Sequence, residues 1–472
     1  MTSLLPILPA LLLGFGGMAL LLVGVLTKPE PAGFTTWGAI VLLVVAALVS
    51  CAAPDTLLFH GLLKTSLFTR FADALVYTAA VAALLLALDY NRKEGIARFE
   101  YPILVLLGVL GMVVMISAAD LMSLYIGFEL QSLALYIAAA LARDSVRSTE
   151  AGLKYFVLGA LASGLLVYGI SLVYGFTGTT SFAALAGLLG ANIGYGAVIG
   201  LVFVIVGLAF KISAAPFHMW TPDVYEGAPT SVTALFGTAP KAAAMALFLS
   251  VMTGPFGHLL AQWQMIIEIL AIISMALGAL AAIGQTNIKR LMAYSSIGHM
   301  GYALMGLAAG TEAGIQATLI YVAIYVVMSF GAFACIIAMR RRGQAVEKIS
   351  DLAGLAAQRP GFAFAMALFM WAMAGIPPLS GFFGKLYVFS AALNAGLVTL
   401  VIIGIITSVI SAFYYLRVIK VMYFDAGAPD FDAVPASVNF VMAVGAAVTA
   451  LFILLPAPLI TAASAAAKAL MG

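Results

Sequence analysis

Apolar runs of about twenty residues recur from one end of the chain to the other, and few charged residues fall inside them. A helix of about twenty apolar residues crosses the roughly 30 Å hydrocarbon core of a bilayer. Charged residues make up only 9% of the chain and hydrophobic residues 64%, whereas a soluble fold uses about 25% charged residues to cover its surface. The runs therefore predict an all-α polytopic membrane protein.

We expect a single transmembrane domain over residues 1–472 with fourteen spans. The first run is preceded by Thr2 and Ser3 rather than by basic residues, which favours a retained span over a cleaved signal peptide. An even number of spans predicts that both termini lie on the same side of the membrane. The expected spans are 4–26, 36–53, 70–88, 102–119, 121–142, 152–176, 194–215, 229–253, 265–284, 292–309, 315–339, 362–393, 396–422 and 438–456.

Lysine and arginine are distributed unevenly among the loops that join these spans. When each basic residue is assigned to its nearest loop, the odd-numbered loops hold sixteen, while the even-numbered loops and the tail hold only Lys64, Arg70 and Lys468. Cytoplasmic loops carry an excess of basic residues. The asymmetry predicts that the odd loops are cytoplasmic and that both termini lie on the opposite, periplasmic side.

Several kinds of site are excluded by what the chain lacks. A net charge of +3 is too small for a nucleic-acid-binding surface. Cys51 and Cys335 are far apart and cannot hold an iron–sulfur cluster or a structural zinc, so we expect no cofactor and no metal in this chain. His218, near Asp223 and Glu226, is a weak candidate for a metal ligand and a better candidate for capping its loop.

Three basic residues belong to no loop and fall inside the expected spans, Lys211, Lys241 and Lys385, and Glu129 in the fifth span is their acidic counterpart. Each costs about 2.5–3.5 kcal/mol at the middle of a bilayer, so four unpaired charges would cost on the order of 10 kcal/mol, comparable to the net stability of a whole domain. Either each charge is structural, reaching an interface or neutralising a neighbour, or the four serve transport. Ionisable residues in spans favour the second interpretation.

Proline lies close in sequence to each of the three lysines, at Pro216, at Pro240 and at Pro377–Pro378. Because proline removes a backbone donor and clashes with the preceding turn, these helices are expected to be interrupted, as helices along the ion paths of transporters are. The first and last interruptions are about 160 residues, or five spans, apart and therefore cross in opposite directions. This spacing predicts two inverted five-helix repeats, over 102–253 and 265–422.

Polar residues also recur at helical spacing within the spans. They form either transport-related networks or interhelical hydrogen bonds that only stabilise packing, and His299 is either a core histidine or part of a proton relay. The three polar stripes are Tyr125, Glu129, Ser132 and Tyr136; Ser295, His299 and Tyr302; and Tyr321, Tyr325 and Ser329.

Buried lysine and glutamate together suit proton transfer. Burial disfavours the lysine cation, and a nearby carboxylate favours it again, so a Glu129–Lys211 pair can act as a switch that holds or releases a proton. The spans contain no carboxylate-rich cage of the kind that binds a metal cation. The residues therefore predict a membrane proton path.

Four motifs make the chain resemble a known family, the antiporter-like membrane subunits of proton-translocating NADH:quinone oxidoreductase (respiratory complex I). These subunits are related to subunits of multi-subunit cation/proton antiporters. The Tyr225–Pro229 segment and the lysine in the last broken helix make the chain most similar to the subunit N group. The motifs are Gly127-Phe-Glu129-Leu, Phe210–Thr230, Lys289–Tyr302 and Gly375–Lys385.

The resemblance implies roles for matching positions. It implies that Glu129 and Lys211 form the coupled pair, that Lys241 is the central relay, that Lys385 is the terminal site and that His299 lies between them. It also implies a bacterial inner-membrane location, with other complex I membrane subunits, including neighbouring antiporter-like subunits, as partners. NADH, FMN, iron–sulfur clusters and quinone would then be bound in or between other subunits.

Two alternatives remain open at this point. One is a subunit of a stand-alone cation/proton antiporter, against which the Tyr225–Pro229 segment argues. The other is a structural spacer whose buried charges only fix the register of its helices.

Overall fold

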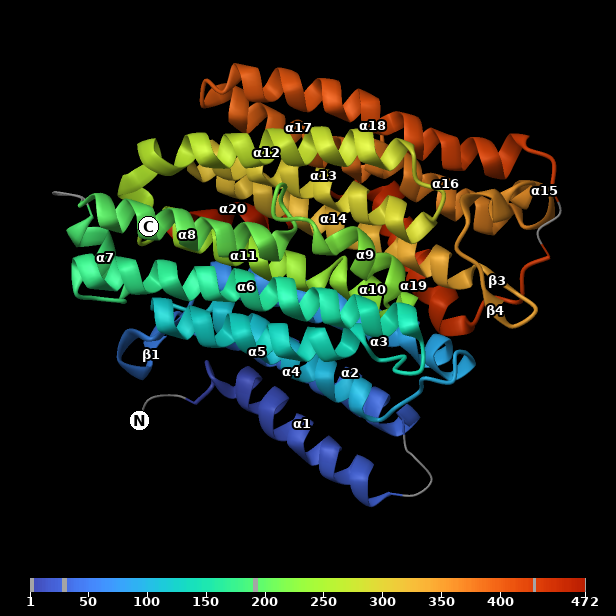
Figure 1. The fold of residues 1–472 in the computed structure, drawn as a ribbon, viewed down its shortest axis with the longest axis horizontal. Coiled ribbons are helices and arrows are strands. Elements are labelled where there is room, and N and C mark those ends of the chain that lie inside the picture. The colour runs from blue at the N-terminus through green and yellow to red at the C-terminus, as the bar shows by residue number, and fades with distance from the viewer. Residues whose placement is uncertain (1–3, 28–31, 190–193, 428–429, 472) are drawn as a thin grey trace.

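The computed structural model describes residues 4–27, 32–189, 194–427 and 430–471. Its helices run roughly along the long axis of Figure 1 and stack side by side, with two short β-hairpins at opposite ends. The hairpins are β1 (Thr56–Leu58) with β2 (Leu63–Thr65), and β3 (Arg340–Arg341) with β4 (Gln344–Ala345). The described residues therefore form the all-α membrane architecture that the apolar runs predict.

Ten helical segments among the described residues are long and apolar enough to cross a membrane. One of them consists of two helices in succession, α10 (Thr230–Phe236) and α11 (Ala239–Thr253), and another, α12, is preceded by a short 3-10 turn over Gly257–Leu259. Helix α12 itself spans Leu260–Ile283. The other eight segments are α1 (Leu8–Leu26), α2 (Ala32–Ala52), α3 (Leu67–Lys93), α5 (Leu121–Ala139), α6 (Val146–Thr177), α8 (Tyr195–Ile212), α14 (Glu312–Ala338) and α18 (Val398–Phe424).

The remaining helices are shorter or less apolar. Each of the fourteen expected spans overlaps a helix or an interrupted helix pair, and α20 is a further helix that the sequence analysis did not predict. These helices are α4 (Glu100–Ile116), α7 (Phe182–Leu188), α9 (Trp220–Gly227), α13 (Ile288–Ala308), α15 (Leu355–Gln358), α16 (Pro360–Ala374), α17 (Ser380–Asn394), α19 (Ala436–Leu451) and α20 (Ala457–Met471).

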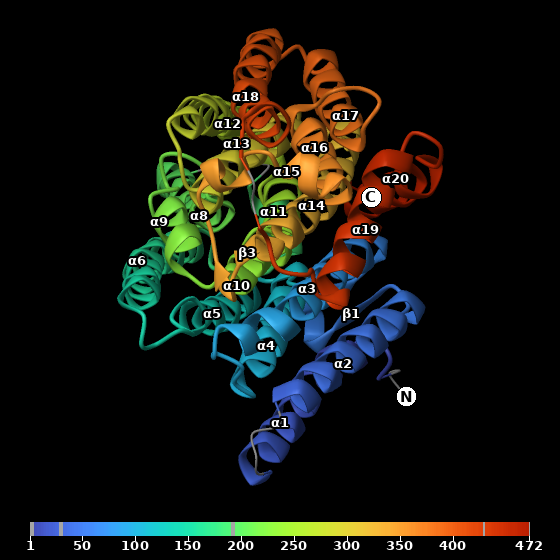
Figure 2. The ribbon, with the colours of Figure 1, turned by 90° about the vertical axis from the view of Figure 1, so that its right-hand side faces the viewer.

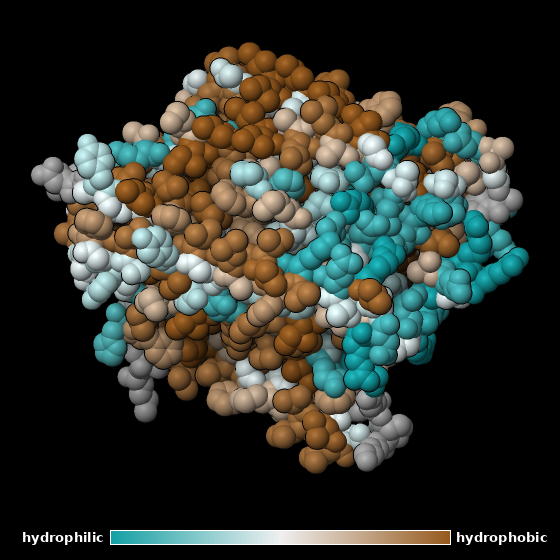
Figure 3. Space-filling view, in the orientation of Figure 1, coloured by the Kyte–Doolittle hydropathy of each residue, from teal (hydrophilic) through white to brown (hydrophobic). Residues whose placement is uncertain are grey.

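The two ends of the helix stack differ in polarity. The labels for both termini lie at the left end of Figure 1, near β1, and β3 and β4 lie at the right end. Hydrophilic residues gather over this right end in Figure 3, whereas hydrophobic residues dominate the rest of the face shown. We name the two ends the terminal end and the charged end.

Helix α14 occupies the centre of the stack. In the end-on view of Figure 2 it lies between α11, α16 and α19, while α1 and α2 form one edge and α18 the other. Of its most apolar stretch, 94% is buried inside the chain, compared with 22% for α1. Polar side chains on α14 therefore face other helices rather than lipid.

Three breaks interrupt the helices near the prolines. Helix α8 ends at Ile212, where Ser213 is left-handed with φ 64°, and the chain turns before α9 begins. Helix α16 ends at Gly375, whose φ of 87° suits glycine, and α17 starts at Ser380. Thr238 separates α10 from α11, which has a proline in its first turn. The predicted interruptions are therefore present.

Close helix crossings depend on glycine. On α4, a Cβ added at Gly111 would lie 2.4 Å from the backbone nitrogen of Gln131, and one added at Gly127 on α5 would lie 2.5 Å from the backbone nitrogen of Met115. Small residues let membrane helices approach this closely. The crossing of α4 and α5 thus fixes the depth and rotation of Glu129, two residues after Gly127.

Replacing Gly127 with valine is expected to push α4 and α5 apart. Over-packing a tight contact costs about 1–3 kcal/mol, and here the obstruction is backbone that cannot rotate away. The thermal unfolding midpoint in mild detergent should fall. Gly164→Val, on the neighbouring helix α6, is the matched control because a Cβ there meets nothing within 4 Å. Equal midpoints for the two variants would contradict this account of the crossing.

Candidate functional site

Three lysines and one histidine lie buried in the membrane-spanning part of the chain. Lys211 is 4% exposed, Lys241 1%, Lys385 5% and His299 3%. Lys211 comes from α8, Lys241 from α11, Lys385 from α17 and His299 from α13, and we call these four residues the row. Glu129 on α5 differs from them, because it is only half-buried.

The predicted partners Glu129 and Lys211 both reach hydroxyl groups. Ser163 on α6 donates a hydrogen bond to the Glu129 carboxylate and lies 3.2 Å from the Tyr125 hydroxyl. The Lys211 ammonium donates to the Ser132 hydroxyl at 2.6 Å and lies 4.6 Å from the centre of the Phe128 ring. Ser132 follows Glu129 by three residues on the same helix face, and among the described residues no ion pair within 4 Å joins Glu129 directly to Lys211.

Lys241, like Lys211, donates a hydrogen bond to a hydroxyl group on another helix. Its ammonium donates to Ser296 on α13, and the Ser296 hydroxyl lies 2.7 Å from the Tyr325 hydroxyl on α14. The ring of Tyr225 lies 5.5 Å from the same ammonium. Lys241 starts α11 directly after the helix break, so the break aims its side chain at α13 and α14.

His299 is bonded through both ring nitrogens. Its Nδ1 lies 2.7 Å from the Tyr321 hydroxyl on α14, and its Nε2 lies 3.1 Å from the Tyr415 hydroxyl on α18. Tyr415 is in turn 2.5 Å from the Ser295 hydroxyl. A histidine that is bonded on both sides can receive a proton at one nitrogen and release one from the other.

Lys385 closes the row beside the break between α16 and α17. Its ammonium donates to the Ala374 carbonyl and to the Ser408 hydroxyl, each at 2.9 Å. The Ala374 carbonyl is available because α16 ends there. The Tyr302 ring lies 4.8 Å from the same ammonium, and the Tyr302 hydroxyl is 3.3 Å from that of Thr407.

A run of aromatic rings lies beside Lys211 and Lys241: the ring centres of Phe210 and Trp220 are 5.7 Å apart, and those of Trp220 and Tyr225 are 6.3 Å apart. Tyr155 stacks on Trp220 with ring centres 4.3 Å apart, and the Trp220 indole donates to the Phe210 carbonyl at 3.1 Å. Gln131, which is fully buried, has no hydrogen-bond partner for its amide within the described residues, and neither has the Tyr225 hydroxyl. No hydrogen bond among the described residues joins the group around Lys211 to the group around Lys241, so the network has two parts, and we call the rings beside them the aromatic layer.

Some predicted residues lie apart from the row. Tyr136 packs edge-on against Tyr155, with ring centres 4.7 Å apart. The Ser329 hydroxyl finds no hydrogen-bond partner in the described part of the chain. His218 lies in the turn before α9, whose first turn has no side-chain cap. Residues 4–27, 32–189, 194–427 and 430–471 contain no group of three or more histidine, cysteine or acidic residues that could hold a metal.

Four network residues were missed in the sequence: Ser163, Ser296, Ser408 and Tyr415. Each supplies a hydroxyl from a helix other than that of its charged partner. Ser296 lies directly beside Ser295 within the Lys289–Tyr302 motif, which was a usable signal. The other three lie in apolar runs where a serine or tyrosine is an ordinary packing residue.

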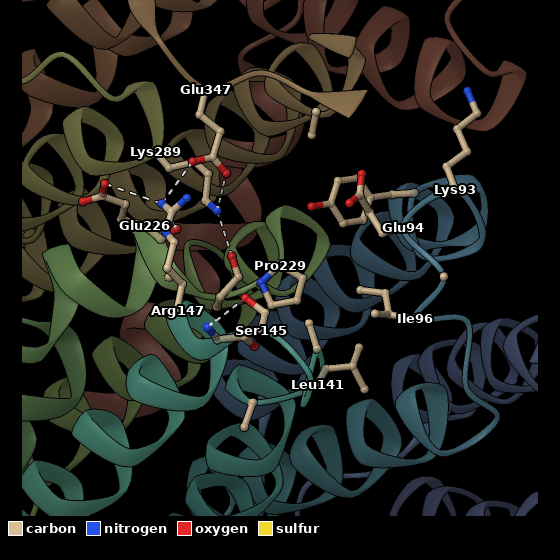
Figure 4. A pocket seen from close by; sticks show the side chains of 18 of the residues that line it. Lys93, Glu94, Ile96, Leu141, Ser145, Arg147, Glu226, Pro229, Lys289 and Glu347 are labelled. Atoms are coloured by element: carbon tan, nitrogen blue, oxygen red, sulfur yellow. Dashed lines mark hydrogen bonds and ion pairs between the residues drawn. The ribbon is translucent and has the colours of Figure 1, made fainter. Parts of the chain in front are cut away.

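A second charged group lies at the charged end, around a pocket of about 1480 Å³ (Figure 4). Lys289, only 2% exposed, is 2.9 Å from the Glu347 carboxylate and donates to the Ala228 carbonyl at 2.8 Å. Arg147 lies 3.3 Å from Glu347 and 3.5 Å from Glu226. These pairs join the start of α6, the end of α9, the start of α13 and the loop after β4.

The charges around Glu347 decide its ionisation. Burial alone would raise the pKa of Glu347, but the charge of Lys289 and hydrogen bonds from Lys289 and Asn287 outweigh burial and hold that pKa below its ordinary value. In the folded loop Glu347 is therefore the charged carboxylate.

Comparison with known proteins decides the family. A family model described as "NADH:quinone oxidoreductase/Mrp antiporter, TM" matches residues 118–411. The chain is 62% identical to NADH-quinone oxidoreductase subunit N 1 of Acidiphilium cryptum, over 100% of this chain and 99% of that protein. It is 56% identical to subunit N of Rhodospirillum rubrum, over 98% and 97%. The chain belongs to the antiporter-like membrane subunits of NADH:quinone oxidoreductase, in the subunit N group.

Solved structures agree with this assignment. A chain of respiratory complex I from Thermus thermophilus is 30% identical, with a TM-score of 0.82, covering 97% of this chain and 99% of that one. A chain of the Mrp complex from Dietzia sp. has a TM-score of 0.86 over 100% of both chains but is only 22% identical, so that likeness shows the fold alone. The subunit N assignment is therefore favoured over the antiporter alternative.

Glu347→Gln in this subunit is expected to loosen the loop after β4, because Lys289 is left buried without its counter-charge. Leaving a charged group unpaired costs about 2 kcal/mol, roughly thirtyfold in an opening equilibrium. Hydrogen exchange should accelerate at the amides of Ile288 and Ile349, which donate to the carbonyls of Glu347 and Thr286. Glu150→Gln, which changes an exposed glutamate, is the control.

The pH dependence has a defined sign. Because the folded-state pKa of Glu347 is lowered, its contribution to stability is present above the ordinary glutamate pKa and is lost as pH falls through the folded value. After correction for intrinsic exchange chemistry, acidification should therefore open the loop in wild type and have little effect in Glu347→Gln. A loop that opens equally in both would refute this role of the carboxylate.

Proposed function

We propose that this chain is a proton-translocating, non-redox subunit of a bacterial NADH:quinone oxidoreductase, coupling quinone reduction elsewhere in the complex to proton transfer. The observation that carries the proposal is the buried row that contains Lys241, His299 and Lys385, in which hydroxyl groups of neighbouring helices meet each charged or titratable side chain. Such rows are expensive in a membrane unless they serve transport.

The coupling step is assigned to Glu129, Ser132 and Lys211. The Ser132 hydroxyl accepts from the Lys211 ammonium and lies on the same helix face as Glu129. A movement of the Glu129 carboxylate toward Ser132 favours the protonated lysine, and a movement away favours proton release. Redox energy released elsewhere in the complex would drive that movement.

Transfer then proceeds from Lys211 past the aromatic layer to Lys241, and on to Lys385. Gln131 and the Tyr225 hydroxyl are the buried polar groups without partners on the first stretch, and they are suited to hold water there. Two pairs at hydrogen-bond distance, Ser296 with Tyr325 and His299 with Tyr321, serve the second stretch. Lys385 is the terminal site.

The two interrupted helices support the proposed inverted repeats, 102–253 and 265–422. In each, a break follows an apolar helix, after Ile212 in α8 and after Ala374 in α16. A buried lysine lies at each break, at the end of α8 and on α17. Repeats of this kind place two half-paths at the same depth in the membrane.

The assembly and orientation follow from charge placement. A half-buried glutamate at membrane depth is costly to expose to lipid, so Glu129 is expected to lie against a neighbouring membrane subunit. The charged end holds the odd-numbered loops, which supports a cytoplasmic charged end and periplasmic termini in the inner membrane. NADH, FMN, iron–sulfur clusters and quinone are assigned to other subunits.

The assignment to the complex has a direct test. Membranes are solubilised in mild detergent, separated on a native gel and stained for NADH dehydrogenase activity, and this chain is located by mass spectrometry. Co-migration with the large NADH-oxidising band is expected. Migration in a separate band without that activity would favour the stand-alone antiporter.

Glu129→Gln should abolish or strongly reduce proton pumping per electron while leaving an assembled complex. The substitution keeps the shape of the side chain but removes the charge that acts on Lys211 through Ser132. Proton uptake is measured in reconstituted vesicles against NADH oxidation. Glu312→Gln, at an exposed position at the start of α14, is the control. A full proton-to-electron ratio in Glu129→Gln would favour the structural-spacer alternative.

The Lys385→Arg variant distinguishes a residue that only supplies a positive charge from one that also passes on a proton. Arginine keeps the positive charge but does not release its proton at working pH, so a relay lysine replaced by arginine should pump as poorly as Lys385→Met. Lys420→Arg, at an exposed lysine of α18, should pump normally. The same vesicle assay applies, and wild-type pumping in Lys385→Arg would show that position 385 needs only a charge.

A further inference from the structure

We infer that Asp73 on α3 is a second proton-binding site. It holds a proton as the neutral acid and exchanges this proton with water at the terminal end of the molecule. Asp73 is 5% exposed, and its Oδ1 atom has no hydrogen-bond partner among the described residues. It lies outside the segment 118–411 that defines the family and on none of the helices that carry the lysine row. The inference therefore does not rest on the relay proposed above.

A small cavity lined by polar groups lies beside Asp73. The cavity has a volume of about 30 Å³ and lies where α1, α2, α3 and α4 meet the β1–β2 hairpin. A cavity of this size has room for a water molecule when polar groups surround it. Those groups are present: besides Asp73, the lining includes Ser50, Thr65, Thr69 and Ser117.

The surroundings provide no counter-charge that would keep Asp73 ionised. Arg70 also lines the cavity, but its guanidinium is bound to the Ala53 carbonyl and lies 2.7 Å from Asp55, which is 56% exposed. The cavity residues contributed by α1, α2 and α4 include no titratable side chain. Ser50 on α2 is the hydrogen-bond partner of the Asp73 side chain. Burial without a counter-charge favours the protonated carboxyl.

Access to Asp73 is from one side only. Its polar neighbours in the cavity lie toward the β1–β2 hairpin, at the terminal end. In the other direction, one helical turn brings the buried Tyr77, whose hydroxyl also has no partner among the described residues. Beyond it, the buried face of α3 is apolar through Ala80, Ala83 and Leu84. A proton can thus bind and leave at one face but has no path across, which distinguishes this site from the row.

Infrared difference spectroscopy of the assembled complex tests the site. The wild-type spectrum minus that of Asp73→Asn, at neutral pH, should contain the C=O stretching band of one protonated carboxyl. The band should shift when the complex is transferred to D₂O, because the cavity lets the proton exchange. Asp55→Asn, at the exposed aspartate of the same region, is the matched control and should leave this band in place.

A second variant keeps the test decisive if Asp73→Asn fails to assemble. Ser50→Ala retains the carboxyl but removes its hydrogen-bond partner, so the same band should move in frequency between wild type and Ser50→Ala. A carboxylate band in place of the carboxyl band would overturn the inference. So would a carboxyl band that is unchanged in D₂O, because that would describe a sealed structural group rather than an exchanging site.

Discussion

The cost of holding a positive charge away from water governs this molecule. Each buried lysine of the row donates to a hydroxyl of another helix, Lys211 to Ser132, Lys241 to Ser296 and Lys385 to Ser408. A neutral hydroxyl accepts the hydrogen bond of the ammonium group. Unlike a carboxylate, it does not hold the lysine in its charged form. The lysines are therefore tolerated in either protonation state, and the helices must pack closely enough to deliver those hydroxyls at hydrogen-bond distance.

The helix breaks reduce the free-energy cost of a buried positive charge in a different way. A continuous helix consumes its own carbonyls, so it can offer none to a side chain at mid-membrane. Where α16 ends, the Ala374 carbonyl accepts from Lys385, and where α10 gives way to α11, Lys241 begins a new helix and points at α13. The prolines that read as interruptions in the sequence thus determine both the direction of the lysines and part of their coordination.

The sequence predicted the parts of this arrangement that depend on a single helix. The spans, the breaks and the charged members Glu129, Lys211, Lys241 and Lys385 follow from apolar length, proline and the rarity of charge in lipid. Partners on other helices did not follow, because Tyr415 and Ser408 become visible only once α18 is placed against α13 and α17. The edge-on contact of Tyr136 with Tyr155 on α6 likewise joins two helices and could not be predicted from helical spacing within α5.

The division of the row into two parts has a physical consequence. Between Lys241 and Lys385, Ser296 lies within hydrogen-bond distance of Tyr325, and His299 within that distance of Tyr321 and Tyr415, so under the proposed function protons have to cross only the gaps between these groups. Between Lys211 and Lys241, no hydrogen bond among the described residues connects the two groups, and the Gln131 amide has no partner there, so under the proposed function a proton needs a rearrangement or inserted water to cross. An energy-converting path requires one such closed step, because a row open throughout would let protons flow back down their gradient. The aromatic layer lies next to Lys211, where a displacement of Glu129 would be felt first.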